Sequence, residues 1–276
     1  MRALAAAAAT IVLLAGPSAA AEARAPRPSV ASASAAIVVD ARSGAVLLQK
    51  HPDARRPIAS TTKLMTALLV LERDRLDQVF TAPPYNALPA ESKINLRTGE
   101  RMKVRDLLTG LLLESANDAA VDLAVGTAGS RDAFVAAMNR RARSLGLRNT
   151  HYANPVGLDA RGNYSSARDL AALARRLMQN RTFARIVDRP SARLLSGSHP
   201  RVVRNRNLLV GRYRFIDGVK TGHTLGAHYV LVGAAHGHGG KVVSVVLGEP
   251  GENARDADTL ALLRWGVDQF RTVTLP

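Results

Sequence analysis

Three short segments of the chain carry side chains that together suit acyl transfer through a serine. They are Ser60-Thr61-Thr62-Lys63, Ser115-Ala116-Asn117 and Lys220-Thr221-Gly222, in that order. A serine hydroxyl is a weak nucleophile until a neighbouring group accepts its proton. The segments supply a nucleophile, an amine base, a polar proton relay and a cation for a substrate carboxylate. Each segment alone is a weak signal, but their combination and order predict a serine acyl-transfer site.

The first segment pairs Ser60 with Lys63 on one face of a predicted helix, because residues three apart are neighbours on a helix surface. The helix predicted over residues 60–71 is apolar nearly all round, and Lys63 is its only charged side chain. Burial and a second nearby cation both lower a lysine pKa, which a neutral amine base requires. The chain has six lysines against 32 arginines, and arginine stays protonated. Ser60 and Lys63 are therefore the predicted nucleophile and base.

The second segment falls at a break between two predicted helices, where side chains project into a cleft. We expect Ser115 to pass a proton to the leaving nitrogen. Asn117 is expected to bond both a substrate amide and Lys63. The alternative interpretation of Ser115 is structural, as an N-cap that begins the helix after it.

The third segment is predicted to end a strand. A lysine and a hydroxyl at Lys220 and Thr221 suit a substrate carboxylate, and Gly222 lets a ligand lie close along the strand edge. The backbone N–H of His223 is expected to join that of Ser60 as an oxyanion hole. The alternative is an ordinary strand end.

The elements that must position these residues are strands and helices, which occupy different parts of the chain. Strand-rich runs lie near both chain ends, and helices lie between them. Strands at both ends predict an α+β fold in which one mostly antiparallel sheet packs against a helical block. The two end hairpins are expected to pair with the Lys220 strand. The predicted strands are 36–40, 45–48, 212–219, 229–234 and 241–247; the predicted helices are 60–71, 104–113, 117–125 closed by Gly126, 131–145 capped by Ser130, 170–178 capped by Ser166, and 254–270.

The chain resembles the D-alanyl-D-alanine carboxypeptidases, the low-molecular-weight penicillin-binding proteins of the serine peptidase S11-type family, from about Ala35 to Thr274. Besides the three motifs, the resemblance rests on Asn154-Pro155-Val156-Gly157-Leu158-Asp159, on residues 164–170 and on residues 217–224. It implies a β-lactamase/transpeptidase-like fold. It also implies Ser60 as the acyl-enzyme nucleophile and Lys63 as the proton acceptor, with Ser115 and Asn117 in the cleft and Lys220 binding substrate.

The resemblance further implies that the terminal D-alanine of peptidoglycan stem peptides is the group removed, and that β-lactam antibiotics are covalent inhibitors. Many relatives carry a second, β-rich domain and a C-terminal amphipathic membrane helix. This chain stops at Pro276, so we expect a single catalytic domain over residues 35–276. Shorter relatives can cut cross-linked peptides, so a D,D-endopeptidase is the first alternative.

A β-lactamase and a non-catalytic wall-binding module are weaker interpretations. A β-lactamase needs a glutamate between the second and third motifs, and none occurs from Ala116 to Val219. Glu91 and the Ser-Lys-Ile-Asn that follows it have a similar pattern but precede Ser115. A wall-binding module would not need intact motif residues. His228, His236 and His238 have no carboxylate at useful spacing, so we expect no metal and no cofactor.

Residues 1–25 have the pattern of a secretory signal peptide, with a positive start at Arg2 and an apolar run to Leu14. A short polar linker follows over residues 26–34. We therefore expect an exported protein that is periplasmic or extracellular, in the cell wall, with no transmembrane anchor once the signal is removed. The net charge is +16 and there is no cysteine. Such a basic surface suits anionic wall polymers or a lipid surface, whereas no aromatic-rich strand or basic helix points to nucleic acid.

Overall fold

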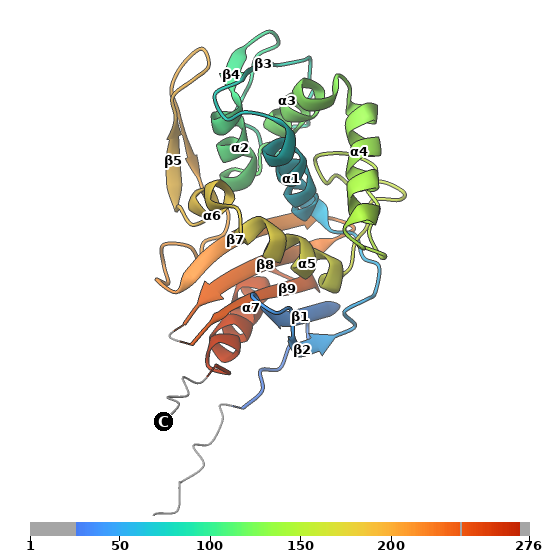
Figure 1. Cartoon of the computed structure of the whole chain (residues 1–276), viewed down its shortest axis with the longest axis vertical. Coiled ribbons are helices and arrows are strands. Elements are labelled where there is room, and N and C mark those ends of the chain that lie inside the picture. The colour runs from blue at the N-terminus through green and yellow to red at the C-terminus, as the bar shows by residue number, and fades with distance from the viewer. Residues whose placement is uncertain (1–25, 238, 271–276) are drawn as a thin grey trace, which may run out of the picture.

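The computed structural model describes residues 26–237 and 239–270, and the predicted signal peptide lies outside them. Its centre is a five-stranded antiparallel sheet in the order β2-β1-β9-β8-β7 (Figure 1). The strands are β1 (Ala35–Asp40), β2 (Val46–Lys50), β7 (Ile216–Thr224), β8 (His228–His236) and β9 (Lys241–Glu249). The two chain ends therefore build one sheet, as the sequence predicts.

The sheet is covered on both faces. One face carries the helical block and the other carries the last helix, α7 (Figure 1). Side chains of a strand alternate between faces, so Ile37 and Val39 of β1 join the core on the helical-block side. Val38 instead packs with Leu262 and Leu263 of α7. The helices are α1 (Lys63–Arg73), α2 (Val104–Leu113), α3 (Asn117–Ala128), α4 (Arg131–Ser144), α5 (Ala167–Met178), α6 (Arg181–Val187) and α7 (Glu252–Val267).

Several helix ends follow local sequence signals. The Ser130 hydroxyl accepts a hydrogen bond from the Ala133 N–H at 3.1 Å, and Ser166 does the same for the Asp169 N–H at 3.2 Å. Both serines are thus structural caps. The segment 26–34 contributes Val30 and Ala33 to the core on the α7 side.

The start of the first predicted helix and the end of the third differ from the sequence prediction. A 3₁₀ turn, η1 (Ala59–Thr62), carries Ser60, and α1 begins only at Lys63. Helix α3 continues through Gly126 to Ala128, and its C-cap is Gly129, whose φ of 80° is left-handed. A Cβ at Gly126 would lie 2.2 Å from the Phe80 ring, so that glycine serves packing against β3 (Val79–Thr81).

The pairing around the lysine motif also differs. Lys220 lies in the middle of β7, whereas the sequence predicted it at a strand end. Only the C-terminal hairpin pairs with β7, because the β1–β2 hairpin joins the sheet through β9. Sequence patterns also missed α6 and two small hairpins, β3 with β4 (Arg101–Lys103) and β5 (Ser191–Leu194) with β6 (Arg201–Arg204).

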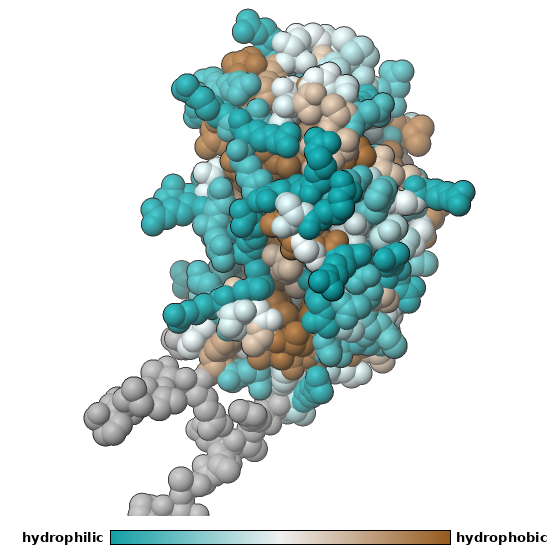
Figure 2. Space-filling model, turned by 45° about the vertical axis from the view of Figure 1, so that its right-hand side comes forward, coloured by the Kyte–Doolittle hydropathy of each residue, from teal (hydrophilic) through white to brown (hydrophobic). Residues whose placement is uncertain are grey.

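Hydrophilic side chains project over much of the face shown in Figure 2, with smaller hydrophobic areas between them. Across the part of the chain that the structure describes, no helix combines the length and apolar character needed to cross a bilayer.

Candidate active site

Ser60 lies on the η1 turn, which packs against β7. The turn is entered through Ala59 at φ 46°, a left-handed conformation that redirects the backbone just before the serine. A Cβ built on Gly222 of β7 would lie 2.9 Å from the Ser60 nitrogen. Glycine at position 222 thus permits the close approach of the nucleophile to the sheet edge.

The Lys63 amine is completely buried and contacts three oxygen atoms. Its Nζ lies 2.9 Å from Ser60 Oγ, 2.6 Å from Asn117 Oδ1 and 2.5 Å from the Val156 carbonyl oxygen. Burial holds the pKa of Lys63 well below its ordinary value, and the positive charge of Lys220 lowers it further. Negative charges on Glu91 and Asp118 oppose this shift. The structure therefore brings the predicted nucleophile and base into direct contact.

Ser115 lies between α2 and α3 with a left-handed φ of 64°. Its Oγ accepts a hydrogen bond from Lys220 Nζ at 2.9 Å. The N-cap position of α3 is Ala116, and no side chain caps that helix. The alternative interpretation of Ser115 as a helix cap is therefore wrong, because its side chain points to Lys220 instead.

Lys220 is also buried, and its Nζ donates to the Thr221 carbonyl at 2.8 Å as well as to Ser115. Burial lowers the pKa of Lys220 to about 7, and the charges of Arg206 and Arg255 act in the same direction. Sequence reasoning did not single out these two arginines. Both are themselves paired, Arg206 with Glu114 and Arg255 with Glu252 and Asp256, and the charge of Glu114 opposes the shift.

The remaining predicted residues lie on β7, the strand that carries Lys220. Thr221 and Gly222 are buried, and the exposed ring of His223 stacks on Tyr229 at a centroid distance of 4.1 Å. Their contacts with substrate, and the oxyanion role of the Ser60 and His223 N–H groups, stay predictions.

A loop formed by residues 154–159 closes the site on another side. The Val156 carbonyl accepts from Lys63, and the Pro155 carbonyl accepts from Thr66 Oγ1 at 2.8 Å. Asn154 Oδ1 accepts from the Gly157 N–H at 2.7 Å, which fixes the turn. The resemblance includes this stretch, but the residue types alone assigned it no function.

Glu91 is a further group that sequence reasoning did not assign to the site. It reaches the site from the loop between β3 and β4, where its Oε2 accepts from Asn117 Nδ2 at 2.7 Å. Chain order had set Glu91 aside, because it precedes Ser115. The order of residues along the chain does not show a contact that forms only on folding.

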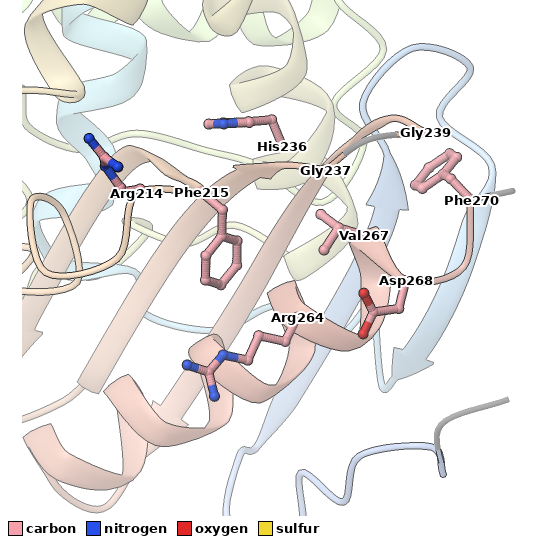
Figure 3. A pocket seen from close by; sticks show the side chains of 9 residues that line it. All are labelled: Arg214, Phe215, His236, Gly237, Gly239, Arg264, Val267, Asp268 and Phe270. Carbon is pink, nitrogen blue, oxygen red and sulfur yellow. The ribbon is translucent and has the colours of Figure 1, made fainter. Parts of the chain in front are cut away.

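A cavity of about 750 Å³ lies elsewhere, between the start of β7, the end of β8 and α7 (Figure 3). Arg214, Phe215 and Arg264 line it, and none of the predicted site residues does. Within residues 26–237 and 239–270, no group of three or more His, Cys, Asp or Glu side chains is arranged to hold a metal ion. Of the three histidines considered as ligands, His238 lies outside the described residues, and His236 Nδ1 is 2.7 Å from Asp217 Oδ1.

Comparison with known proteins agrees with this geometry. Residues 20–251 match the family model described as D-alanyl-D-alanine carboxypeptidase. The chain is 33% identical to the D-alanyl-D-alanine carboxypeptidase DacF of Bacillus subtilis, over 87% of this chain and 63% of that protein. It is 36% identical to DacA of Escherichia coli, over 86% of this chain and 61% of that protein. The chain thus spans less than two thirds of the length of these two relatives.

Among solved structures, the Streptomyces K15 DD-transpeptidase superposes with a TM-score of 0.82 at 33% identity. The match covers 88% of this chain and 99% of that one. The α+β fold with an antiparallel sheet is therefore shared with that enzyme.

Proposed function

Because the chain belongs to the D-alanyl-D-alanine carboxypeptidase family of peptidases, we propose that it removes the terminal D-alanine of peptidoglycan stem peptides through an acyl-enzyme at Ser60. The observation that carries this proposal is the buried Lys63 amine, 2.9 Å from the Ser60 hydroxyl. Burial lowers the pKa of Lys63 well below its ordinary value and so favours the neutral amine, which is the form that accepts a proton.

Acylation follows from the contacts of Lys63. A neutral amine has two N–H donors and one lone pair. The donors match Asn117 Oδ1 and the Val156 carbonyl, which leaves the lone pair for the Ser60 hydroxyl. Ser60 Oγ attacks the carbonyl carbon between the two D-alanines, and its proton passes to Lys63. The C–N bond then breaks, and the leaving amine takes a proton relayed through Ser115.

The leaving residue carries a carboxylate, and Lys220 with Thr221 is its proposed binding site. An opposite charge nearby favours the protonated lysine. A bound carboxylate therefore raises the pKa of Lys220 from its value of about 7 in the free site. The charges of Arg206 and Arg255 act against protonation of Lys220 in the free site, and the charge of Glu114 opposes them.

Hydrolysis of the acyl-enzyme by water completes the carboxypeptidase reaction. A second candidate is transfer of the acyl group to an amine, favoured by the close likeness to a DD-transpeptidase. Both reactions share the first half, so the acceptor alone distinguishes them. Cleavage within cross-links, the D,D-endopeptidase alternative, differs only in the group that leaves.

The direct test incubates the purified protein with a D-Ala-D-Ala pentapeptide, with a cross-linked dimer, and with the pentapeptide plus an amine acceptor. We expect mass spectrometry to show loss of one alanine from the pentapeptide. The Ser60→Ala variant is expected to lose both turnover and covalent penicillin labelling. An active Ser60→Ala variant would refute the acyl-enzyme, while a dimer cut faster than the pentapeptide would favour the endopeptidase.

The reaction with penicillin also tests the β-lactamase alternative. Glu91 stands near Asn117 although it precedes Ser115 in the chain, so chain order alone does not exclude a glutamate from the site. We expect a long-lived adduct on Ser60, and steady-state penicillin turnover would reverse this expectation.

We also propose that the protein is exported by the segment 1–25 and acts outside the cytoplasm, in contact with anionic wall polymers or a membrane surface. The net charge of +16 supports this proposal. Binding to such a polymer that persists at high salt would contradict an electrostatic origin.

A further inference from the structure

The Glu91 carboxylate is linked to the Lys63 amine through a single side-chain amide. Asn117 Nδ2 donates to Glu91 Oε2 at 2.7 Å, and Asn117 Oδ1 accepts from Lys63 Nζ at 2.6 Å. The two residues that flank Asn117 in space are 54 and 26 positions away from it in the chain. Folding therefore builds a carboxylate–amide–amine chain inside the site.

An ionised carboxylate accepts hydrogen bonds and cannot donate them. It selects the NH₂ end of the Asn117 amide, so the carbonyl end must turn toward Lys63. The opposite orientation would aim two N–H donors at the amine and leave the carboxylate facing an oxygen. Glu91 thus determines which end of Asn117 the base meets.

Glu91 is itself firmly held. Tyr85 Oη donates to its Oε2, and the Leu88 N–H donates to its Oε1 at 2.9 Å. The Asn117 N–H donates to the Ser92 carbonyl at 2.8 Å, which ties the loop to the start of α3. Burial raises the pKa of Glu91, but the hydrogen bonds from Tyr85 and Asn117 outweigh it and leave the pKa below its ordinary value. The carboxylate therefore stays ionised at neutral pH.

We propose that Glu91 is a positioning residue for acylation, which holds the Asn117 amide with its oxygen toward Lys63. This inference rests on the proposed function, since it assigns Glu91 a part in activating Ser60. Charged groups face Lys63 from three elements: Lys220 on β7, Asp118 on α3 and Glu91 on the loop before β4. Loss of the Glu91 charge consequently changes the protonation of Lys63 as well as the orientation of Asn117.

The test compares penicillin acylation rates across pH in wild-type, Glu91→Gln and Glu91→Asp proteins. The Gln side chain keeps the shape but can present an NH₂ group to Asn117. We expect its plateau rate to fall roughly tenfold, the scale of one lost charge-assisted hydrogen bond. The acidic limb of the pH–rate profile of Glu91→Gln should move to lower pH, because a negative charge that raises the Lys63 pKa is gone. Glu91→Asp should keep the limb near its wild-type position.

Glu72→Gln is the matched control, because Glu72 lies on α1 with Lys63 but binds Arg141 and Arg176 at the surface. We expect its rate and pH limb to match wild type. A purely structural effect of Glu91→Gln would lower the unfolding temperature and the active fraction without moving the limb. That result, or a wild-type rate with an unmoved limb, would overturn the proposal.

A second readout does not depend on activity. The side-chain amide resonances of Asn117 in ¹⁵N spectra of the free protein should shift in Glu91→Gln and exchange faster with solvent. Unchanged resonances would overturn the proposed orientation. If the wild-type protein takes up no penicillin, the proposed function fails, while these spectra still decide whether Glu91 holds Asn117.

Discussion

At the residue scale, the site depends on two buried lysines that cannot both be charged without cost. Each positive charge lowers the pKa of a neighbouring amine, and Lys63 feels the charge of Lys220. Arg206 and Arg255 lower the pKa of Lys220 in the same way, and Glu114 opposes them. A substrate carboxylate bound at Lys220 would favour the protonated form of that lysine.

Replacing Lys63 by arginine separates charge from basicity. Arg keeps a positive charge but stays protonated, so it cannot accept the Ser60 proton. We expect Lys63→Arg to slow penicillin acylation by about 10³-fold, within the range for loss of a general base. Mass spectrometry of the adduct over time measures the rate. Lys241→Arg, at an exposed position on β9, is the matched control and should acylate normally. An active Lys63→Arg variant would exclude Lys63 as the base.

At the element scale, the loop of residues 154–159 positions both members of the Ser60–Lys63 pair. Its Val156 carbonyl accepts from Lys63, and Gly157 packs against the η1 turn. At Gly157 the backbone has φ 91°, and a Cβ there would lie 2.1 Å from the Ala59 carbonyl oxygen. No neighbouring side chain can relieve this contact, because the atom it meets belongs to the backbone. Only glycine fits between the loop and the turn.

We expect Gly157→Ala to displace the loop and slow acylation by about tenfold or more, with a loss of stability of about 2 kcal/mol from backbone strain and overlap. Gly129→Ala is the matched control. It has a similar φ of 80° but nothing within 4 Å of the added methyl. It should lose about 1 kcal/mol from its left-handed backbone and acylate normally. Thermal unfolding and penicillin adduct formation measure the two effects. Equal acylation by both variants would show that the loop does not position the pair.

The elements that sequence patterns predicted best are those with local signals. Ser130 and Ser166 mark helix starts through hydrogen bonds to residues only three positions further along the chain. Gly126 was wrongly predicted to end its helix. Its packing partner Phe80 lies on another element, so the sequence around Gly126 does not indicate the contact. The same division holds in the site. Ser60, Lys63 and Lys220 were predicted from residue type and spacing, whereas the contacts of Glu91 and Val156 form only on folding.

At the scale of the whole molecule, the candidate site lies where three parts of the fold meet. The helical block supplies Lys63 and Asn117, the edge strand β7 supplies Lys220, and the intervening loops supply Glu91 and Val156. Its integrity therefore depends on the packing of the helical block against the sheet.

The core of that block contains an unusual group, the Asp122 side chain of α3. It is fully buried, and neither carboxyl oxygen has a hydrogen-bond partner among the described residues. Burial raises the pKa of Asp122 to about 7, and the negative charges of Asp118 and Glu100 act in the same direction. An unpaired buried charge of this kind is costly to the folded state.

The cost of Asp122 should depend on pH in a defined direction. At about pH 3 the carboxyl is protonated in both folded and unfolded chains, and no charge is buried. As the pH rises from about 4 to 7, the unfolded chain loses its proton first, so folding stability falls. Above about pH 7 the full cost is present, about 4 kcal/mol for a shift of this size.

Asp122→Asn removes the ionisation and keeps nearly the same volume. We expect it to be more stable than wild type by about 2 kcal/mol or more at about pH 8, since the uncharged amide still buries polar atoms. At about pH 4 the advantage should largely disappear, because wild-type Asp122 is then close to neutral in the folded state. Urea unfolding at several pH values measures the difference. Asp268→Asn, which removes an exposed carboxylate after α7, should leave the pH dependence unchanged. A wild-type stability curve that Asp122→Asn does not flatten would mean that Asp122 is solvated or paired in the folded protein.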